Sequence, residues 1–433
     1  MGVGRAALPP DRGGQLKSIR SRISDGLEPV TFGLFCIAAA TYPFSVAAAN
    51  VALGSALVTG LLGGQLAKGA QRLWIEHRAF TLAWMLYLAL LPLGLIWSMD
   101  RPWGLHVIAR QWYWLLIPLA VSVLSSRSGQ RTFLAILSIS LTAHLAFCVG
   151  QLLGWTDFTK DGSTAMDPTG HIGHIGFGFV YGVWAGWLLH WGLLQYGWRR
   201  WGAWLLAAWS VTMVFLAAGR SGYLIVPLLL LAVAWKLLRF KPWLKVAAAL
   251  LVIATGVAAL AYGPGKARIL WTMSGIQAIE KGNFRKAEAR WSLWYAAIET
   301  WRTHTPMGVG TGGYPKAAAE VKLAHPGLWY GGTRSAHPHN MYLLALSRWG
   351  PLGTIALLVL LYLWIRTAWR LDWHHTDAAS LIALPALAMA IHGLSASSLE
   401  EHFPAILAAL LLGVGLAAAG TDKDIANPSP FDG

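Results

Sequence analysis

The stretch LIVPLLLLAVAWKLL at residues 224–238 would be apolar on every face of a helix, apart from Lys236 near its end. Comparable apolar runs of roughly 20 residues, the length needed to cross about 30 Å of hydrocarbon, recur from near Pro29 to near Ala419. Strands of an outer-membrane barrel would instead alternate apolar and polar residues over about ten positions. The sequence therefore predicts an all-α integral membrane protein.

The composition excludes an ordinary soluble domain. Of the 433 residues, 56% are hydrophobic and 12% are charged, whereas a soluble domain has about 25% charged residues. The 25 tryptophans fit belts at the membrane interfaces. The two cysteines, Cys36 and Cys148, both fall in apolar segments, so neither a disulfide framework nor a cysteine metal site is indicated.

We count twelve candidate spans, centred near residues 38, 57, 88, 114, 142, 183, 209, 230, 253, 361, 387 and 410. Basic residues recur in the loops on the side of the basic N-terminus, at residues 68–78, 127–131, 199–200, 236–245 and 366–370. By the positive-inside rule this side is cytoplasmic, as are both termini. The net charge of +15 is explained by these loops facing anionic lipid, so no binding to nucleic acid is expected.

The predicted organisation has five parts. They are a cytoplasmic N-terminal tail at residues 1–28, spans one to nine at 29–262, a large periplasmic loop at 263–340, spans ten to twelve at 341–420, and a cytoplasmic C-terminal tail at 421–433. Loops as long as the third part are usually functional. Residues 285–303 of this loop predict an amphipathic helix along the membrane surface, with Trp291, Trp294 and Trp301 at helical spacing.

Arg220 lies in the motif AGRSGY, at the predicted outer junction of spans seven and eight. An arginine there either contacts lipid headgroups or marks a functional site. We favour the site, because Gly219 and Gly222 would let an anion approach the backbone and Ser221 adds a donor. Arg110, about a turn into the predicted fourth span, is equally compatible with lipid contact and with a site.

Two further motifs lie in the large loop. In RWSLW at residues 290–294, the guanidinium of Arg290 has the geometry to bind phosphate or diphosphate, although one arginine alone is a weak indication. The run GVGTGG at residues 308–313 satisfies the G-x-G-x-x-G pattern, but no βαβ unit surrounds it. A dinucleotide site is therefore not predicted, and the glycines indicate a structural turn.

The most reactive cluster is SAHPHNMY at residues 335–342, immediately before the tenth span. Either His337 or His339 could act as a general base near neutral pH. The alternatives are an ordinary helix start and a metal site. A metal would need further ligands from His171, His174, His304, His325 or the run EEH at residues 400–402, and nothing in the sequence fixes that geometry, so no metal is predicted.

Taken in order, GRSG at residues 219–222, Arg290 with its tryptophans, PMGVG at 306–310 and HPHNMYL at 337–343 resemble the O-antigen ligase and polymerase superfamily. The resemblance covers roughly residues 30–420. It implies a GT-C-like arrangement of about twelve transmembrane helices, with one large helical periplasmic loop between spans nine and ten. Within the superfamily, the chain looks like the ligase that completes lipopolysaccharide in the bacterial inner membrane.

The resemblance implies a transferase that moves O-antigen from undecaprenyl diphosphate to a sugar hydroxyl of lipid A-core in the periplasm, without a cofactor. It assigns proton transfer to His339 and His337, and diphosphate binding to Arg220 and Arg290. Weaker candidates for substrate binding are Arg110, Ser221, Asn340 and Tyr342.

Elementary chemistry agrees with this assignment. A diphosphate leaving group needs cations and no protonating acid, and arginines supply the cations without a metal. Direct displacement inverts the anomeric carbon, and no carboxylate pair suited to a covalent glycosyl intermediate stands out in the large loop. The alternatives are an O-antigen polymerase, a protein O-oligosaccharyltransferase and, from another class, a transporter of lipid or solute.

Overall fold

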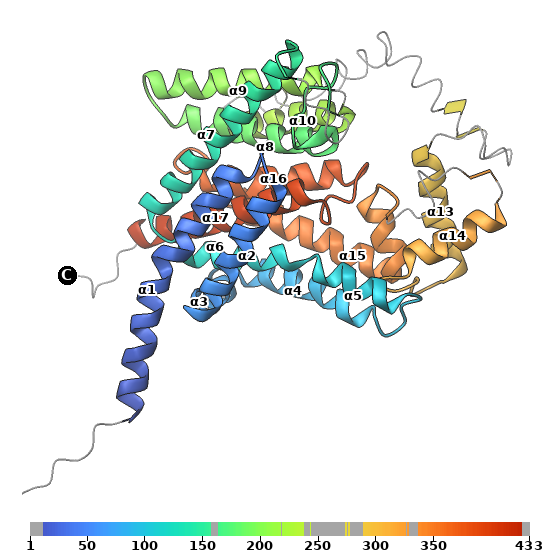
Figure 1. Cartoon of the computed structure of the whole chain (residues 1–433), viewed down its shortest axis with the longest axis horizontal. Helices are drawn as coiled ribbons and strands as arrows, with labels where there is room; N and C mark the ends of the chain where they lie inside the picture. Colours follow the sequence, from blue (N-terminus) through green and yellow to red (C-terminus); the bar gives the residue numbers. More distant parts are fainter. Residues whose placement is uncertain are drawn as a thin grey trace, which may run out of the picture.

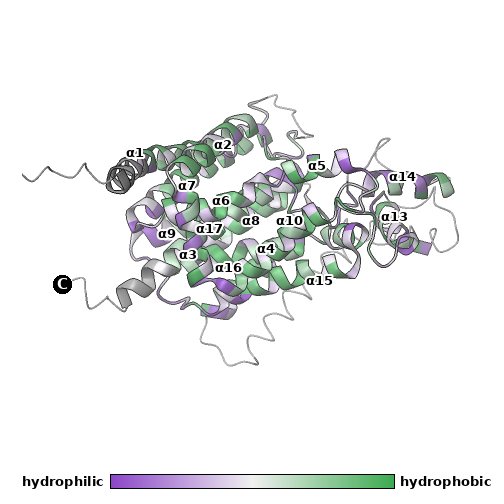
Figure 2. Ribbon diagram, turned by 90° about the horizontal axis from the view of Figure 1, so that it is seen from below, coloured by the Kyte–Doolittle hydropathy of each residue, from purple (hydrophilic) through white to green (hydrophobic). Residues whose placement is uncertain are grey.

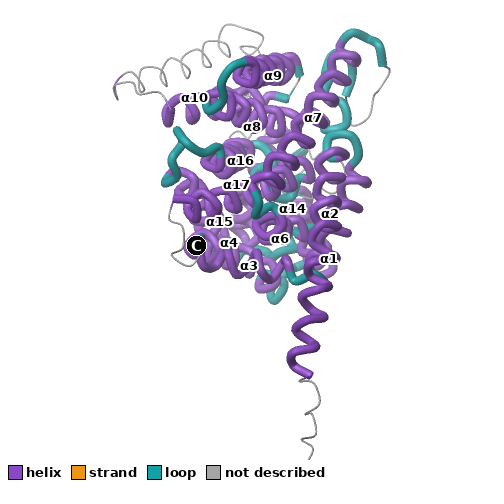
Figure 3. Tube along the Cα trace, turned by 90° about the vertical axis from the view of Figure 1, so that its left-hand side faces the viewer, coloured by secondary structure: helices purple, strands orange, loops and turns teal. Residues whose placement is uncertain are grey.

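The computed structural model describes residues 12–156, 163–217, 219–237, 289–325 and 337–426, together with residues 243, 273–274, 276–277 and 327–328. Within these ranges the regular structure is helical, and the only bridge between extended residues pairs Thr164 with Asp167 (Figure 3). The predicted all-α class is therefore confirmed for the described part of the chain. Residues 157–162, the ninth predicted span near residue 253, and, within the predicted loop at 263–340, most of residues 263–288 and residues 329–336 lie outside the described residues.

The described helices are α1 (Arg12–Thr41), α2 (Val46–Leu62), α3 (Gln65–Glu76), α4 (Arg78–Leu93), α5 (Arg101–Ala109), η1 (Trp112–Leu115), α6 (Leu116–Val123), α7 (Arg127–Leu152), α8 (Gly173–Leu193), α9 (Trp198–Leu216), α10 (Arg220–Leu237), α13 (Ala289–Thr303), α14 (Tyr314–Ala324), α15 (Met341–Trp369), α16 (Ala378–His392) and α17 (His402–Ala426). Most of them form one bundle, and α13 and α14 lie together at one end of it, near α5 and α15 (Figure 1). Hydrophobic residues dominate the bundle helices, whereas hydrophilic residues are frequent around α13 and α14 (Figure 2).

Several described helices are suited to a membrane. By length and hydropathy, α7, α15 and residues His402–Gly420 of α17 can each cross a bilayer, and α2 with α3, bent by 83° at their junction, is a possible fourth span. Shorter apolar helices cover Gly26–Thr41, Arg78–Leu93, Ser221–Leu237 and Ala378–His392. A described helix thus lies at every predicted span centre except the one near residue 253.

The helix α17 lies inside the bundle, because its apolar window is completely buried by the other helices. Small residues permit this close packing: an added Cβ on Gly413 would meet Ala120 of α6 at 2.5 Å, and one on Gly415 would meet Ile382 of α16 at 2.6 Å. Because α17 is buried among the other helices, the loop directly before it, which carries Glu400 and Glu401, leads into the interior of the bundle.

The predicted fourth span is not a single helix. It is divided into α5, η1 and α6, and Arg110 is the C-terminal cap of α5, not a residue inside a span. Local polar groups stabilise the break: the side-chain oxygen of Gln111 accepts hydrogen bonds from Tyr113 Oη and Trp114 Nε1, both at 2.9 Å. The hydropathy pattern could not reveal this, because both sides of the break are apolar.

A kink in α15 receives the glycine-rich loop at residues 306–313. Gly350 has φ +63° inside the helix, and Pro351 has no N–H to bond the carbonyl of Ser347. The carbonyls of Ser347 and Arg348 accept hydrogen bonds instead from the backbone N–H groups of Val309 and Gly310, at 2.9 and 2.8 Å. The loop is therefore built into the fold as a structural turn.

The glycines of this loop are required by close backbone contacts. Gly310 has φ +77°, and a Cβ there would lie 2.4 Å from Ser98 Cα and 2.5 Å from the carbonyl oxygen of Gly94. On the other side, Thr311 Oγ1 donates to the carbonyl of Leu91 at 2.7 Å and accepts from Trp349 Nε1 at 3.1 Å. The loop thus joins the C-terminal end of α4 to the kink of α15.

We predict that Gly310→Ala destabilises the protein by about 1–3 kcal/mol, because alanine must adopt a left-handed conformation and displace two backbone segments. The measurement is thermal unfolding in detergent. The matched control is Gly54→Ala, since a Cβ on this helical glycine of α2 meets nothing within 4 Å. A melting temperature for Gly310→Ala equal to that of the control would contradict this account of the loop.

Candidate functional site

Five segments that are far apart in the sequence converge at one end of the bundle. They contribute Arg110 after α5, Arg290 near the start of α13, His337 and His339 before α15, Arg348 within α15, and Glu400 and Glu401 before α17. The charges of Arg110, Arg348 and Glu400 all act on His337, and the charge of Arg290 acts on His339. The structure therefore brings together the two predicted histidines and two of the three predicted arginines.

The histidines form a close pair. Their ring centroids are 4.4 Å apart with the planes at 69°, and the backbone N–H of His339 points to Nδ1 of His337 at 3.4 Å. His339 has φ +52°, a left-handed conformation that few residues other than glycine adopt. Such strained residues persist where the surroundings determine them and are frequent at functional sites.

Asn340 and Tyr342 anchor this pair to the bundle. Asn340 caps α15, with its side-chain oxygen accepting from the N–H groups of Tyr342 and Leu343 at 3.0 Å and its amide donating to the carbonyl of Leu394 at 3.1 Å. Tyr342 Oη donates to the carbonyl of Ala390 at 2.7 Å. Their polar groups thus hold the start of α15 against the end of α16.

The surroundings keep both imidazoles neutral. Burial lowers the pKa of His339 to about 4, helped by the charges of His337 and Arg290. Burial also lowers the pKa of His337; the carboxylate of Glu400 opposes this, and Arg348 and Arg110 reinforce it. At neutral pH both rings are therefore unprotonated and able to accept a proton.

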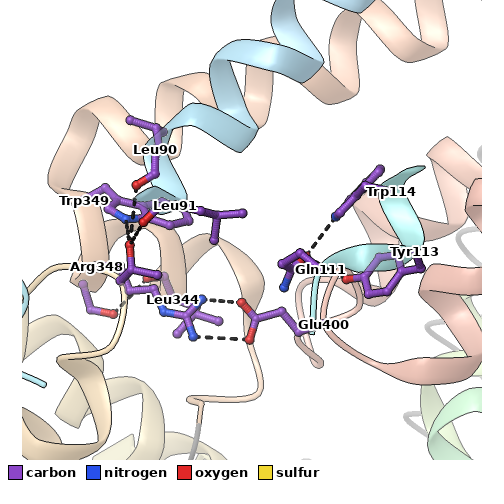
Figure 4. Close-up of polar contacts among 11 residues, drawn as sticks. Leu90, Leu91, Gln111, Tyr113, Trp114, Leu344, Arg348, Trp349 and Glu400 are labelled. Carbon is purple, nitrogen blue, oxygen red and sulfur yellow. Dashed lines mark hydrogen bonds and ion pairs between the residues drawn. The ribbon is translucent and has the colours of Figure 1, made fainter. Parts of the chain in front are cut away.

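A buried ion pair between Arg348 and Glu400 acts on His337, and Figure 4 shows the two side chains of the pair pointing toward each other. Nη1 and Nη2 of Arg348 donate to Oε1 and Oε2 of Glu400, the second at 3.2 Å. The Arg348 side chain is 2% exposed and that of Glu400 22%. Burial raises the pKa of Glu400, but Arg348, His337 and Arg110 together hold it below its usual value, so the carboxylate is ionised.

Arg348 and Glu400 are not among the residues that the sequence predicted for the site. The sequence indicated Glu400 only as a possible metal ligand, and Arg348 does not belong to the resemblance. The sequence signal for Arg348 was a lone charge within an apolar run, which marks a functional candidate in a membrane protein.

Glu401 adds a second acidic group close to Arg290. Burial raises the pKa of Glu401 to about 7; a backbone hydrogen bond from Ser397 and the charge of Arg290 oppose the rise, and Glu400 adds to it. The neighbouring His392 is fixed by Ser398 Oγ at 2.8 Å and by the carbonyl of Ile175 at 3.0 Å. This loop therefore contributes one ionised carboxylate and one that titrates near neutral pH.

Arg290 stands on an exposed position of α13. The predicted helix is confirmed over Ala289–Thr303, while residues 285–288 lie outside the described part. Its buried face is formed by Ser292, Leu293, Ala296, Ala297 and Thr300, and the tryptophans are only half-buried. The face that packs on the protein is thus formed by small and aliphatic residues, because α13 lies closely against α14 and α15.

Arg220 begins α10, but its side chain lies outside the described residues. Its neighbouring glycines have a structural explanation: a Cβ on Gly219 would lie 2.3 Å from the carbonyl oxygen of His174, and one on Gly222 would lie 2.9 Å from Gly178 Cα. Close packing of α10 on α8 requires both glycines. Ser221, between Arg220 and Gly222, is half-buried.

The other histidines considered as metal ligands have local contacts of their own. His174 lies 3.4 Å from Asp167, His304 Nδ1 lies 2.9 Å from the carbonyl of Thr300, and His325 lies 3.5 Å from Tyr295 Oη. Among the described residues, no three His, Cys, Asp or Glu side chains are grouped so that they could hold a metal ion.

The fold and the site define a helical membrane protein with proton-accepting histidines beside arginines at one end of the bundle. The family model for O-antigen ligase matches residues 205–358, which places this segment in the O-antigen ligase superfamily and confirms the resemblance seen in the sequence. The matched segment contains both histidines, Arg220, Arg290 and Arg348, whereas Arg110, Glu400 and Glu401 lie outside it. No curated protein matches the chain.

The lowered pKa of His339 predicts a pH-dependent stability. An unfolded histidine titrates near pH 6.5, so between pH 6.5 and about 4 the unfolded chain binds more protons at this residue than the folded protein does. The contribution of His339 to stability is present above pH 6.5 and is lost as the pH falls toward 4. We predict that the melting temperature of His339→Gln falls less between pH 7 and pH 4.5 than that of wild type, as measured by thermal unfolding. Equal falls in melting temperature would contradict the lowered pKa of His339.

Proposed function

We propose that this protein is the ligase that transfers O-antigen from undecaprenyl diphosphate to a sugar hydroxyl of lipid A-core, and so completes lipopolysaccharide. In this proposal it lies in the bacterial inner membrane with about twelve spans in a GT-C-like arrangement. Both termini are cytoplasmic, and the site faces the periplasm.

One observation carries the proposal: neutral His337 and His339 lie within electrostatic reach of Arg110 and Arg290, at the end of the bundle where α13 and α14 are found. A proton acceptor beside cations is what glycosyl transfer from a diphosphate requires, because the nucleophile must lose a proton while the leaving group gains negative charge. Membership of the superfamily supports the same reaction class.

The proposed reaction is a single displacement. The acceptor hydroxyl loses its proton to the His337–His339 pair as its oxygen forms a bond to the anomeric carbon of the glycan. The bond from that carbon to the diphosphate oxygen breaks on the opposite face, so the anomeric centre is inverted. The departing undecaprenyl diphosphate keeps the electron pair, and Arg290 and Arg220 stabilise its charge by charge-assisted hydrogen bonds. No step requires a metal.

The weaker candidates take different roles. Arg110 is exposed, and its charge acts on His337 and Glu400, so we place it near the diphosphate. Ser221 adjoins Arg220 and would donate to the same group. Asn340 and Tyr342 make hydrogen bonds within the fold, and we assign them to holding the histidine turn, residues 337–339, in place.

We predict that the purified protein, with undecaprenyl diphosphate-linked glycan and rough lipopolysaccharide in the presence of EDTA, forms ligated lipopolysaccharide. His339→Ala should lower the rate by about 10²–10⁴-fold, the usual contribution of general acid–base catalysis. The matched control is His375→Ala, an exposed histidine that pairs only with Asp372 in the turn after α15.

The products separate the alternatives. Lengthened carrier-linked glycan with unused core lipid would identify a polymerase, and transfer only to an added acceptor polypeptide would identify a protein O-oligosaccharyltransferase. Intact donor together with flipping or uptake in proteoliposomes would favour a transporter.

A further inference from the structure

The ion pair between Arg348 and Glu400 joins α15, the helix that follows the histidines, to the loop before α17. Arg348 lies in α15, eight positions after the cap residue Asn340, and Glu400 lies two residues before α17. The backbone of Arg348 is fixed at the kink of α15, because its carbonyl accepts a hydrogen bond from the N–H of Gly310. The pair therefore has a fixed position relative to the histidine turn.

Stability alone does not account for this pair. Burying two charges costs about as much free energy as their attraction returns, and well-packed apolar residues often serve a core equally well. The Nε of Arg348 is buried and has no hydrogen-bond partner among the described residues, so the guanidinium is not fully satisfied by its surroundings. An arginine kept under these conditions indicates a role in the site.

The charges around His337 show what the pair does. Glu400, Arg348, Arg110 and His339 face this imidazole, and of these only the carboxylate of Glu400 favours its protonated form. Glu400 in turn is faced by Arg348, His337, Arg110 and Glu401, and by Tyr87 of α4 and Tyr113 of η1, and it remains ionised because of the cations. Removing this carboxylate would leave the histidine pair surrounded by positive charge.

We propose that Glu400, held in place by Arg348, is a positioning residue whose negative charge stabilises the proton taken up by the His337–His339 pair. This inference rests on the proposed transferase reaction. The proton comes from the acceptor hydroxyl, moves to an imidazole nitrogen as the new glycosidic bond forms, and is stabilised there by Glu400 while the diphosphate leaves. Glu400 does not touch the diphosphate, so donor binding does not depend on it.

The test is the pH–rate profile of Glu400→Gln in the ligation assay. This substitution keeps the size of the side chain and one oxygen for Arg348, and it removes the charge. We expect kcat to fall roughly tenfold, the effect of about one pKa unit in the base, and the acidic limb of the profile to move to lower pH. The KM for the donor lipid should be unchanged, and Glu400→Asp should restore part of kcat.

Two controls separate positioning from structure. Glu299→Gln removes a carboxylate that faces Arg302 at 3.7 Å on α13, and it should leave the profile unchanged. Arg348→Met combined with Glu400→Leu removes both charges, whose effects on His337 oppose each other, so this variant should melt like wild type and shift the acidic limb less than Glu400→Gln does.

The outcomes are distinct. A wild-type pH profile and kcat in Glu400→Gln, or an acidic limb shifted as far in the folded apolar double variant as in Glu400→Gln, would overturn the positioning role while leaving the proposed function intact. Failure of the wild-type protein to form ligated product would instead reject the proposed function itself.

Discussion

A guanidinium inside an apolar bundle must be paired, and much of the end of the bundle that carries the histidines is arranged around that requirement. Arg348 is buried within α15, and the carboxylate that neutralises it comes from the loop before α17. The central position of α17 fixes that loop, and the kink of α15 fixes the arginine through hydrogen bonds with the glycine-rich loop. Both charges of this pair act on His337. The contacts that fix Arg348 and Glu400 in the fold therefore also affect the protonation of the histidine.

The fold class was accessible from the sequence because membrane helices are selected by hydrophobicity alone. Runs such as residues 224–238 require no knowledge of tertiary packing. Interruptions within apolar runs could not be predicted from the sequence. The break after Ala109 depends on side-chain hydrogen bonds at Gln111, and the kink at Gly350 depends on a loop some 40 residues earlier in the chain. The burial of α17 likewise depends on the neighbours that surround it.

The site was predictable in part. His337, His339 and Arg290 carried local signals, namely paired imidazoles before a span and an arginine on a surface helix, and the structure brings them together. The role of Glu400 could not be predicted, because it lies about 60 residues from the histidines and only the fold places it against Arg348. The glycines beside Arg220 suggested close approach of an anion, and the structure uses them for helix packing instead.

The central claim is that the cations beside the histidines hold the diphosphate of a carrier lipid. The most direct measurement is the affinity of the purified protein for undecaprenyl diphosphate, comparing Arg290→Ala with Arg302→Ala, an exposed arginine at the other end of α13. A lost hydrogen bond to a charged group is worth about 1.5–3 kcal/mol, so Arg290→Ala should weaken binding by about tenfold or more, while Arg302→Ala leaves it unchanged. Equal affinity in both variants and wild type would contradict the claim.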